Sequence, residues 1–282
     1  MKRLIVKVLA ENTSLSEKLG SEHGLSLYLE TGSRKILFDT GASGLFARNA
    51  AEMNVDLAAV DLAVISHGHY DHGGGLREFL RRNTGARVFL QERAFETHLA
   101  RRPDGKMVNI GLDKTLLPNE RFIFVGQRFV MEGGLTLFSG VEGGRLRPSG
   151  NHDLLVQEGD SCREDDFGHE QNLILEEDGT RFLIAGCAHT GIVNILEKFR
   201  AEKGCFPDVV IGGFHLYNPA AKKSEDTAVM DEIAEYLMGT KARFYTCHCT
   251  GTEPYRRLKA TMKDRVSYLS TGEELSLHPT RH

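Results

Sequence analysis

Residues 67–72 have the sequence His67-Gly68-His69-Tyr70-Asp71-His72, which places three imidazoles and one carboxylate close together in the chain. The run follows a short apolar segment at 60–65, which predicts a buried strand, and it precedes a helical pattern. Because His67 and His69 are two positions apart, extended backbone would point both to one side, where they can hold one ion. Asp71 and His72 lie where the chain turns toward the helix, and they can hold a second ion beside the first.

The donor types indicate which metals fit. Histidine is the commonest metal ligand, and the chain has 12 His and no Trp. Nitrogen and carboxylate donors in this mixture suit Zn²⁺, with Mn²⁺ and Fe²⁺ as alternatives. We therefore expect two divalent metal ions, most simply zinc. A polar loop that is merely rich in histidine would not have to follow a buried strand, as this one does.

The composition is typical of an ordinary globular protein. The 282 residues are 40% hydrophobic and 26% charged, with 30 Gly and 7 Pro, which argues against disorder and collagen-like repeats. The formal net charge is -4 and no block of consecutive Lys or Arg occurs, so we expect neither nucleic acid nor a membrane as a partner. A small-molecule substrate is the better expectation, and a homo-oligomer stays open.

The cysteines and the N-terminal segment bear on the cellular compartment. No CxxC pair occurs among the five cysteines, which are Cys162, Cys187, Cys205, Cys247 and Cys249, so neither a disulfide framework nor a four-cysteine zinc site is indicated. Lys7 and Glu11 interrupt the first apolar stretch, which favours a strand over a signal peptide. No apolar run approaches the roughly 20 residues that a membrane-spanning helix needs. We therefore expect a cytoplasmic protein.

Hydrophobic periodicity predicts two similar halves in which strands and helices alternate. Strands are expected at 2–10, 25–30, 35–39, 60–65, 86–90, 172–177, 180–185, 208–212 and 243–247. Helices are expected at 43–53, from Gly74 onward, near 192–199, at 225–238 and at 252–263. The segment 92–150 has weaker periodicity, which suits an insertion or a lid over a site. The interpretation is one α/β domain over 1–282, with two β-rich layers and helices on the outside.

The HxHxDH pattern after a strand, preceded by Ile36-Leu37-Phe38-Asp39-Thr40-Gly41, resembles the metallo-β-lactamase fold superfamily. That resemblance implies a four-layer αβ/βα sandwich with a two-metal site at one edge. Three later segments, 184–194, 211–216 and 246–251, resemble one branch of the superfamily. The branch is similar to the archaeal methanopterin-pathway enzyme that joins a dihydropterin to ribofuranosylaminobenzene phosphate.

The resemblance also implies ligands from the second half of the chain. His189, in a Gly-Cys-x-His segment, is expected to complete the first metal site, with His169 as the alternative because it precedes the strand at 172–177. His248 is expected at the second metal. The predicted metal ligands are then His67, His69, Asp71, His72, His189 and His248.

Two cysteine questions stay open at this point. Cys187 occupies the position where many superfamily members have a bridging Asp, so it either bridges as a thiolate or is a small buried residue. His248 lies between Cys247 and Cys249 at the end of a predicted strand. Strict alternation would point both thiols away from the site if His248 points into it.

The remaining candidates carry less specific signals. His215 ends a strand and is either a proton-transfer group or a hydrogen-bonded structural residue, whereas Asp39 either orients a ligand histidine or caps a turn. Tyr70 either contacts substrate or packs as a core aromatic. Arg145 and Arg147 either clamp a phosphate or are solvated. The other histidines are expected at the surface, and they are His23, His98, His152, His278 and His282.

Adjacent metals lower the pKa of a bridging water toward about 7, which makes hydroxide available as a nucleophile at neutral pH. The sequence therefore predicts a dinuclear metal-dependent hydrolase of a small ester or phosphoester. Asp71 would bind metal and orient the nucleophile, and His215 would protonate the leaving group. The branch resemblance offers a transferase that condenses a dihydropterin diphosphate with the aminobenzene phosphate and releases diphosphate. A metal-stabilised ligand-binding module is the third hypothesis.

Overall fold

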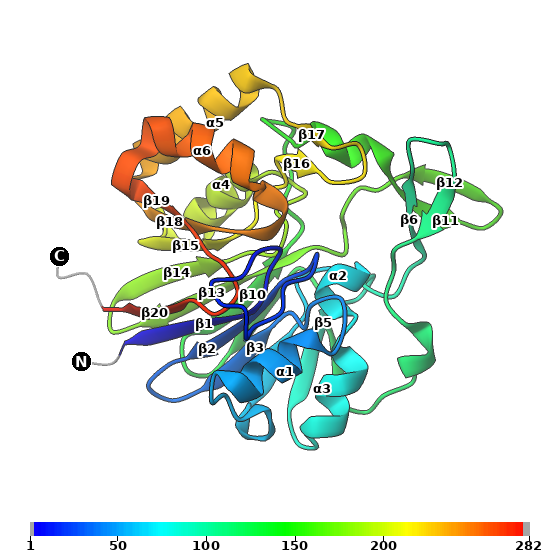
Figure 1. Cartoon of the computed structure of the whole chain (residues 1–282), viewed down its shortest axis with the longest axis vertical. Helices are drawn as coiled ribbons and strands as arrows, with labels where there is room; N and C mark the ends of the chain where they lie inside the picture. Colours follow the sequence, from blue (N-terminus) through cyan, green and yellow to red (C-terminus); the bar gives the residue numbers. More distant parts are fainter. Residues whose placement is uncertain (1–2, 279–282) are drawn as a thin grey trace.

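Two seven-stranded sheets face each other in the computed structural model, which describes residues 3–278 (Figure 1). The first sheet has the order β20 (Glu274–Leu277), β1 (Leu4–Ala10), β2 (Ser26–Glu30), β3 (Lys35–Phe38), β4 (Leu62–Val64), β5 (Arg87–Gln91), β8 (Phe122–Val125). The second has the order β19 (Val266–Tyr268), β18 (Arg243–Thr246), β15 (Val209–Gly212), β14 (Thr180–Ile184), β13 (Gln171–Glu177), β10 (Leu135–Ser139), β9 (Arg128–Met131).

Helices cover the outer face of each sheet. Below the first sheet in Figure 1 lie α1 (Leu45–Glu52) and α3 (Leu76–Arg82). Above the second lie α4 (Ile192–Lys203), α5 (Thr227–Thr240) and α6 (Thr252–Met262). The one-turn helix α2 (Tyr70–Gly73) begins inside the histidine-rich run. These layers confirm the predicted αβ/βα sandwich and, within a few residues, the predicted helices.

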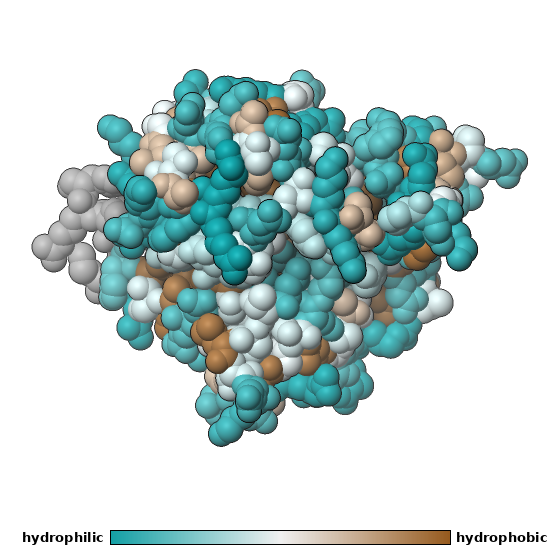
Figure 2. Space-filling view, turned by 45° about the horizontal axis from the view of Figure 1, so that its top comes forward, coloured by the Kyte–Doolittle hydropathy of each residue, from teal (hydrophilic) through white to brown (hydrophobic). Residues whose placement is uncertain are grey.

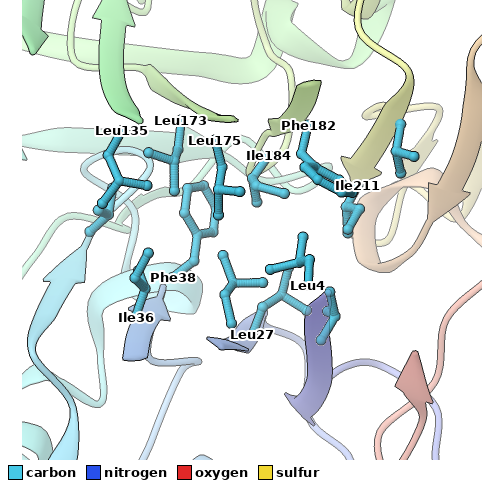
Figure 3. Close-up of a cluster of buried hydrophobic side chains, with 14 of the residues drawn as sticks. Leu4, Leu27, Ile36, Phe38, Leu135, Leu173, Leu175, Phe182, Ile184 and Ile211 are labelled. Carbon is cyan, nitrogen blue, oxygen red and sulfur yellow. The ribbon is translucent and has the colours of Figure 1, made fainter. Parts of the chain in front are cut away.

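Alternating side chains form the core between the layers. In β2, Leu27 and Leu29 point into the cluster between the two sheets, whereas Tyr28 packs into the cluster between the first sheet and helices α1 and α3. Figure 3 shows Ile36 and Phe38 of the first sheet opposite Leu173 and Leu175 of the second, with Ile184 beside them. A third cluster fills the space between the second sheet and its helices. Burying apolar surface on both faces of both sheets supplies the main driving force for this fold.

The segment 92–150 is divided between three sheets. Its strands β8, β9 and β10 belong to the two large sheets, whereas β6 (His98–Arg101) and β7 (Met107–Asn109) pair with β11 (Leu154–Glu158) and β12 (Ser161–Glu164) in a four-stranded sheet. This smaller sheet projects to one side of the molecule (Figure 1). The periodicity is weak here because the strands are short and β7 is exposed along its length.

Several strands are parallel and therefore end at the same edge of the molecule. The pairs β3–β4 and β4–β5 are parallel in the first sheet, as are β14–β15 and β15–β18 in the second. A two-stranded ribbon, β16 (Tyr217–Asn218) with β17 (Lys223–Ser224), follows β15.

The surface of the molecule that Figure 2 shows is mostly hydrophilic. No helix within residues 3–278 is long and apolar enough to cross a membrane.

Candidate metal centre

Segments that follow parallel strands bring the candidate residues together. Asp39 follows β3, and residues 67–73 follow β4. In the second sheet, Cys187 and His189 follow β14, and residues 213–216 and 247–250 follow β15 and β18. Because carboxyl ends of parallel strands meet at one edge, positions far apart in the chain lie within a few ångströms there.

The first group consists of His67, His69 and His189. Their ligand atoms all lie within 4.8 Å of one another, and each residue is at most 4% exposed. None of the three Nε2 atoms has a hydrogen-bond partner within residues 3–278. Burial lowers the pKa of each imidazole well below 6.5, which keeps the rings neutral. Three buried, unpaired nitrogen lone pairs that converge on one point fit a divalent cation.

The second group consists of Asp71, His72, Cys187 and His248. His72 Nε2 lies 3.1 Å from Cys187 Sγ and 3.2 Å from His248 Nε2, and His248 Nε2 lies 3.3 Å from Asp71 Oδ2. One carboxylate, two imidazoles and one thiol form a donor set that suits zinc or another first-row divalent metal. The groups adjoin, since the ring centroids of His67 and His72 are 4.1 Å apart.

Asp39 contacts His72 on the side away from the group. Its Oδ2 accepts a hydrogen bond from His72 Nδ1 at 2.6 Å, while Oδ1 accepts one from the Ser66 amide at 2.7 Å. Burial disfavours the charged imidazole, but the carboxylates of Asp39 and Asp71 outweigh it and raise the pKa of His72 to about 9. Because Nδ1 donates to Asp39, Nε2 faces the other ligands. The geometry thus favours an orienting role for Asp39.

An asparagine and a glutamate hold His189 in place. Asn151 Nδ2 donates to the His189 carbonyl oxygen at 2.7 Å, which leaves Asn151 Oδ1 to accept from His189 Nδ1 at 3.0 Å. The buried Glu170 accepts from the His189 amide at 2.6 Å. The Nδ1 atom therefore carries the proton, and the Nε2 lone pair points at His67 and His69.

The same pattern recurs at His248 with residues from the other half of the chain. Asn12 Oδ1 lies 2.8 Å from His248 Nδ1, and Asn12 Nδ2 donates to the His248 carbonyl at 3.4 Å. Glu11 accepts from the His248 amide at 2.6 Å. Sequence reasoning missed these asparagines and glutamates, because no spacing in the chain relates them to their histidines.

The geometry separates the two alternatives for the third histidine of the first group. His169 Nδ1 accepts from the Gly68 amide at 2.8 Å, and its Nε2 lies 3.0 Å from Asp165 Oδ2. Both ring nitrogens of His169 are thus engaged, whereas only Nδ1 of His189 is. Asp165 also lies 3.1 Å from His98 Nδ1, so His169 belongs to a buried polar network beside the first group.

The expectation of surface positions holds for only some of the other histidines. It is wrong for His98, which is fully buried. His23 is exposed as predicted, with 39% of its side chain accessible, but its Nε2 lies 3.3 Å from Asp71 Oδ2 and it lines the cavity that opens above both groups. Burial and the neighbouring His248 lower the pKa of His23 to about 4. His152 and His278 are exposed as predicted, whereas His282 lies outside the described residues.

The alternation argument for the cysteines is also wrong in part. Strand β18 ends at Thr246, and His248 has a φ of 51° and opens a short 3-10 helix over His248–Thr250, so neighbouring side chains no longer point to opposite faces. Cys249 therefore lies at the site, where its Sγ accepts from the His215 amide at 3.3 Å. Cys247 points into the core between the sheets.

A cavity of about 550 Å³ opens above both groups. His215 and Tyr70 line it, and the ring centroid of His215 is 4.2 Å from that of His189. Of the two alternatives for Arg145 and Arg147, the phosphate clamp is not favoured, since neither lines the cavity: Arg145 stacks over Tyr236 and Arg147 over Phe167. Arg101 and Arg102 line the cavity instead, together with Asn12, His23, His69, Asp71, Ala100, Ile110, Gly150, Asp153, Leu154, Cys187, His189, Tyr217, Asn218, Pro219, Ala220 and Cys249.

Two curated proteins of Methanocaldococcus jannaschii resemble the chain over most of its length. An uncharacterised protein is 25% identical over 259 residues, which cover 90% of this chain and 93% of that protein. The 7,8-dihydropterin-6-methyl-4-(beta-D-ribofuranosyl)-aminobenzene-5'-phosphate synthase is 27% identical over 273 residues, covering 90% of this chain and 89% of the synthase. The predicted branch resemblance thus extends over 90% of the chain.

The structure and a family model agree with this relationship. The crystal structure of Tm1679, described as a metal-dependent hydrolase of the beta-lactamase superfamily, superposes with a TM-score of 0.80 at 28% identity. The match covers 98% of this chain and all of that one. The metallo-beta-lactamase superfamily model matches residues 19–160, which include the histidine-rich run. The chain therefore belongs to the metallo-beta-lactamase superfamily.

Proposed function

We propose that the protein is a dinuclear metal-dependent hydrolase of a small ester or phosphoester. The observation that carries this proposal is that two donor groups adjoin each other and that residues of both groups line the same cavity. His67, His69 and His189 would hold one ion. The other ion would be held by Asp71, His72 and His248, with Cys187 as a further donor.

Asp71 and His215 would have different roles in the reaction. Bound divalent metals supply Lewis-acid activation and lower the pKa of water. Asp71 belongs to the second donor group and also lines the cavity, so it can orient a nucleophile while it binds. His215 lines the cavity next to His189, where it can donate a proton to a leaving group. We also propose that the four-stranded sheet serves as a lid, since Ala100 and Leu154 line the cavity.

The experiment combines metal analysis with a panel of phosphodiester, phosphomonoester, lactone and thioester substrates. We expect two equivalents of metal and turnover of at least one class, with turnover abolished by His69→Ala and by Asp71→Ala. His152→Ala is the matched control, because this histidine is exposed and lies outside the cavity. Circular dichroism establishes that each variant is folded. Hydrolysis that survives both substitutions would show that the site assignment is wrong.

A transferase is the second candidate, and the observation that favours it is the similarity to the synthase over 90% of the chain. The same donor groups would then hold a phosphorylated substrate for condensation. Diphosphate release that requires both dihydropterin diphosphate and the aminobenzene phosphate would support the transferase. A binding module predicts neither hydrolysis nor diphosphate release.

A further inference from the structure

Two of the arginines that the structure describes line the cavity without forming a salt bridge. Arg101 ends β6 and Arg102 follows it, and neither forms a salt bridge within residues 3–278. Many other arginines do pair, such as Arg93 with Asp166 at 3.0 Å. One further carboxylate outside the metal groups, Asp153, lines the cavity but forms no ion pair with either arginine. The cavity thus presents two guanidinium groups that form no salt bridge within residues 3–278, although Arg102 lies near enough to Asp104 to help lower the pKa of that exposed carboxyl.

The segment after β7, the strand that pairs with β6, is fixed to the histidine-rich run. His69 forms a β-bridge with Gly111, and the Tyr70 amide donates to the Ile110 carbonyl at 2.8 Å. At the other end of β6, His98 joins Asp165, which in turn contacts His169. The backbone at Arg101 and Arg102 therefore holds a defined position relative to the donor groups, as a specificity site requires.

The walls between the arginines and the donor groups are partly apolar. Ala100, Ile110 and Leu154 line one part of the cavity, and Pro219 and Ala220 line another. Such walls suit an aromatic or aliphatic body. Guanidinium groups bind carboxylate and phosphate through paired, charge-assisted hydrogen bonds, which gain strength where water is partly excluded.

We propose that Arg101 and Arg102 form an anion-binding subsite, so that the substrate carries a phosphate or carboxylate group remote from the bond that is cleaved. This inference rests on the proposed function for the position of that bond. The substrate class is then a small molecule with an apolar body, an anionic group at one end and an ester or phosphoester at the other.

The kinetic test uses the metal-loaded protein and three esters that differ only at the remote end. These are phenyl acetate, para-acetoxybenzoate and para-acetoxyphenylphosphonate. In the double variant Arg101→Gln/Arg102→Gln we expect kcat/KM for at least one anionic ester to fall roughly 10- to 100-fold, mainly through KM. Turnover of phenyl acetate should stay within about twofold. Which anionic ester loses more distinguishes carboxylate from phosphate.

Arg87→Gln is the matched control, because Arg87 is exposed at the opposite end of β5 from the site. Equal losses for neutral and anionic esters in the double variant, or no loss for any, would overturn the proposal.

A binding measurement separates this inference from the proposed function. Phenylphosphonate has no ester bond, so calorimetric titration of the metal-loaded protein reports binding even if no ester is turned over. We expect the double variant to weaken phenylphosphonate binding roughly 10-fold or more relative to Arg87→Gln. Unchanged affinity would contradict the subsite, whereas weakened affinity without any hydrolysis would retain the subsite and reject the hydrolase.

Discussion

His72 Nδ1 lies 2.6 Å from Asp39 Oδ2, in a place where both side chains are fully buried. A carboxylate can only accept here, so the imidazole donates from Nδ1 and keeps Nε2 for the donor group. Asp39 has a φ of 62°, and the turn it makes after β3 brings its carboxylate under the run that follows β4. The contact links the ends of two adjacent parallel strands to the candidate metal centre.

Asp39→Asn should therefore weaken metal binding at the second group by roughly 10- to 100-fold, because the neutral amide holds the His72 ring less firmly and lowers its basicity. The measurement is competition with a chromogenic chelator. Asp56→Asn is a suitable control, since Asp56 caps an exposed 3-10 turn far from the site. Wild-type affinity in Asp39→Asn would contradict the orienting role.

Asn151→Ala should weaken metal binding about 10-fold, because His189 would lose the partner that fixes its Nδ1 proton. Asn12→Ala should act in the same way through His248. In cobalt-substituted protein both variants should change the visible absorption, which a purely structural defect elsewhere would leave alone. The conservative variant Asn151→Gln tests whether the position of the amide matters. Full cobalt affinity in Asn151→Ala would rule out the role of Asn151 in orienting His189.

Gly186→Ala should destabilise the protein by roughly 1–3 kcal/mol through overpacking. A Cβ at this position would lie 2.6 Å from Ser66 Cβ and 3.2 Å from His67 Nδ1, where buried neighbours leave no room. Gly85→Ala meets nothing within 4 Å and serves as the control. Urea unfolding with a chelator present measures both. Equal unfolding midpoints would indicate that the strand end is more plastic than the packing implies.

The metal-free protein should lose stability as the pH falls below about 6.5. Burial depresses the folded-state pKa of His67, His69 and His189, so the unfolded chain takes up their protons first. Each such histidine costs up to about 1.4 kcal/mol per pH unit in that range. Urea midpoints measured in chelator between about pH 7.5 and about pH 5.5 test this.

His72 works in the opposite direction. Its pKa is raised to about 9, so its stabilisation is complete below the unfolded value and is lost as the pH rises through about 9. Asp39→Asn should reduce this loss at alkaline pH, since the charge of Asp39 would be lost while Asp71 would still raise the pKa of His72, and it should leave the loss on the acid side. A urea midpoint that stays constant at acid pH would contradict the lowered pKa values of His67, His69 and His189. A midpoint that stays constant through about pH 9 would contradict the raised pKa of His72.

Local patterns in the sequence predict the layers of the fold and the centre of the candidate site. Apolar residues alternate in strands such as Ser26–Glu30, and Ile192, Ile195 and Leu196 have helical spacing. Both patterns are local properties of the sequence, and each indicates which face of the element is buried. The spacing of His67, His69, Asp71 and His72 is likewise local, so this candidate metal-binding run can be recognised without coordinates.

Tertiary contacts specify which distant residues lie beside that run. The ligand atom of His189 lies within 4.8 Å of those of His67 and His69, whereas Gly68 and Asp165 engage both nitrogens of His169. Cys249 lies at the site because the chain leaves the extended conformation after Thr246. Arg101 lines the cavity through the pairing of a short sheet. Some contacts at the site join residues that are very far apart in the chain, such as Asn12 and His248, which are separated by 236 positions. No local spacing encodes them.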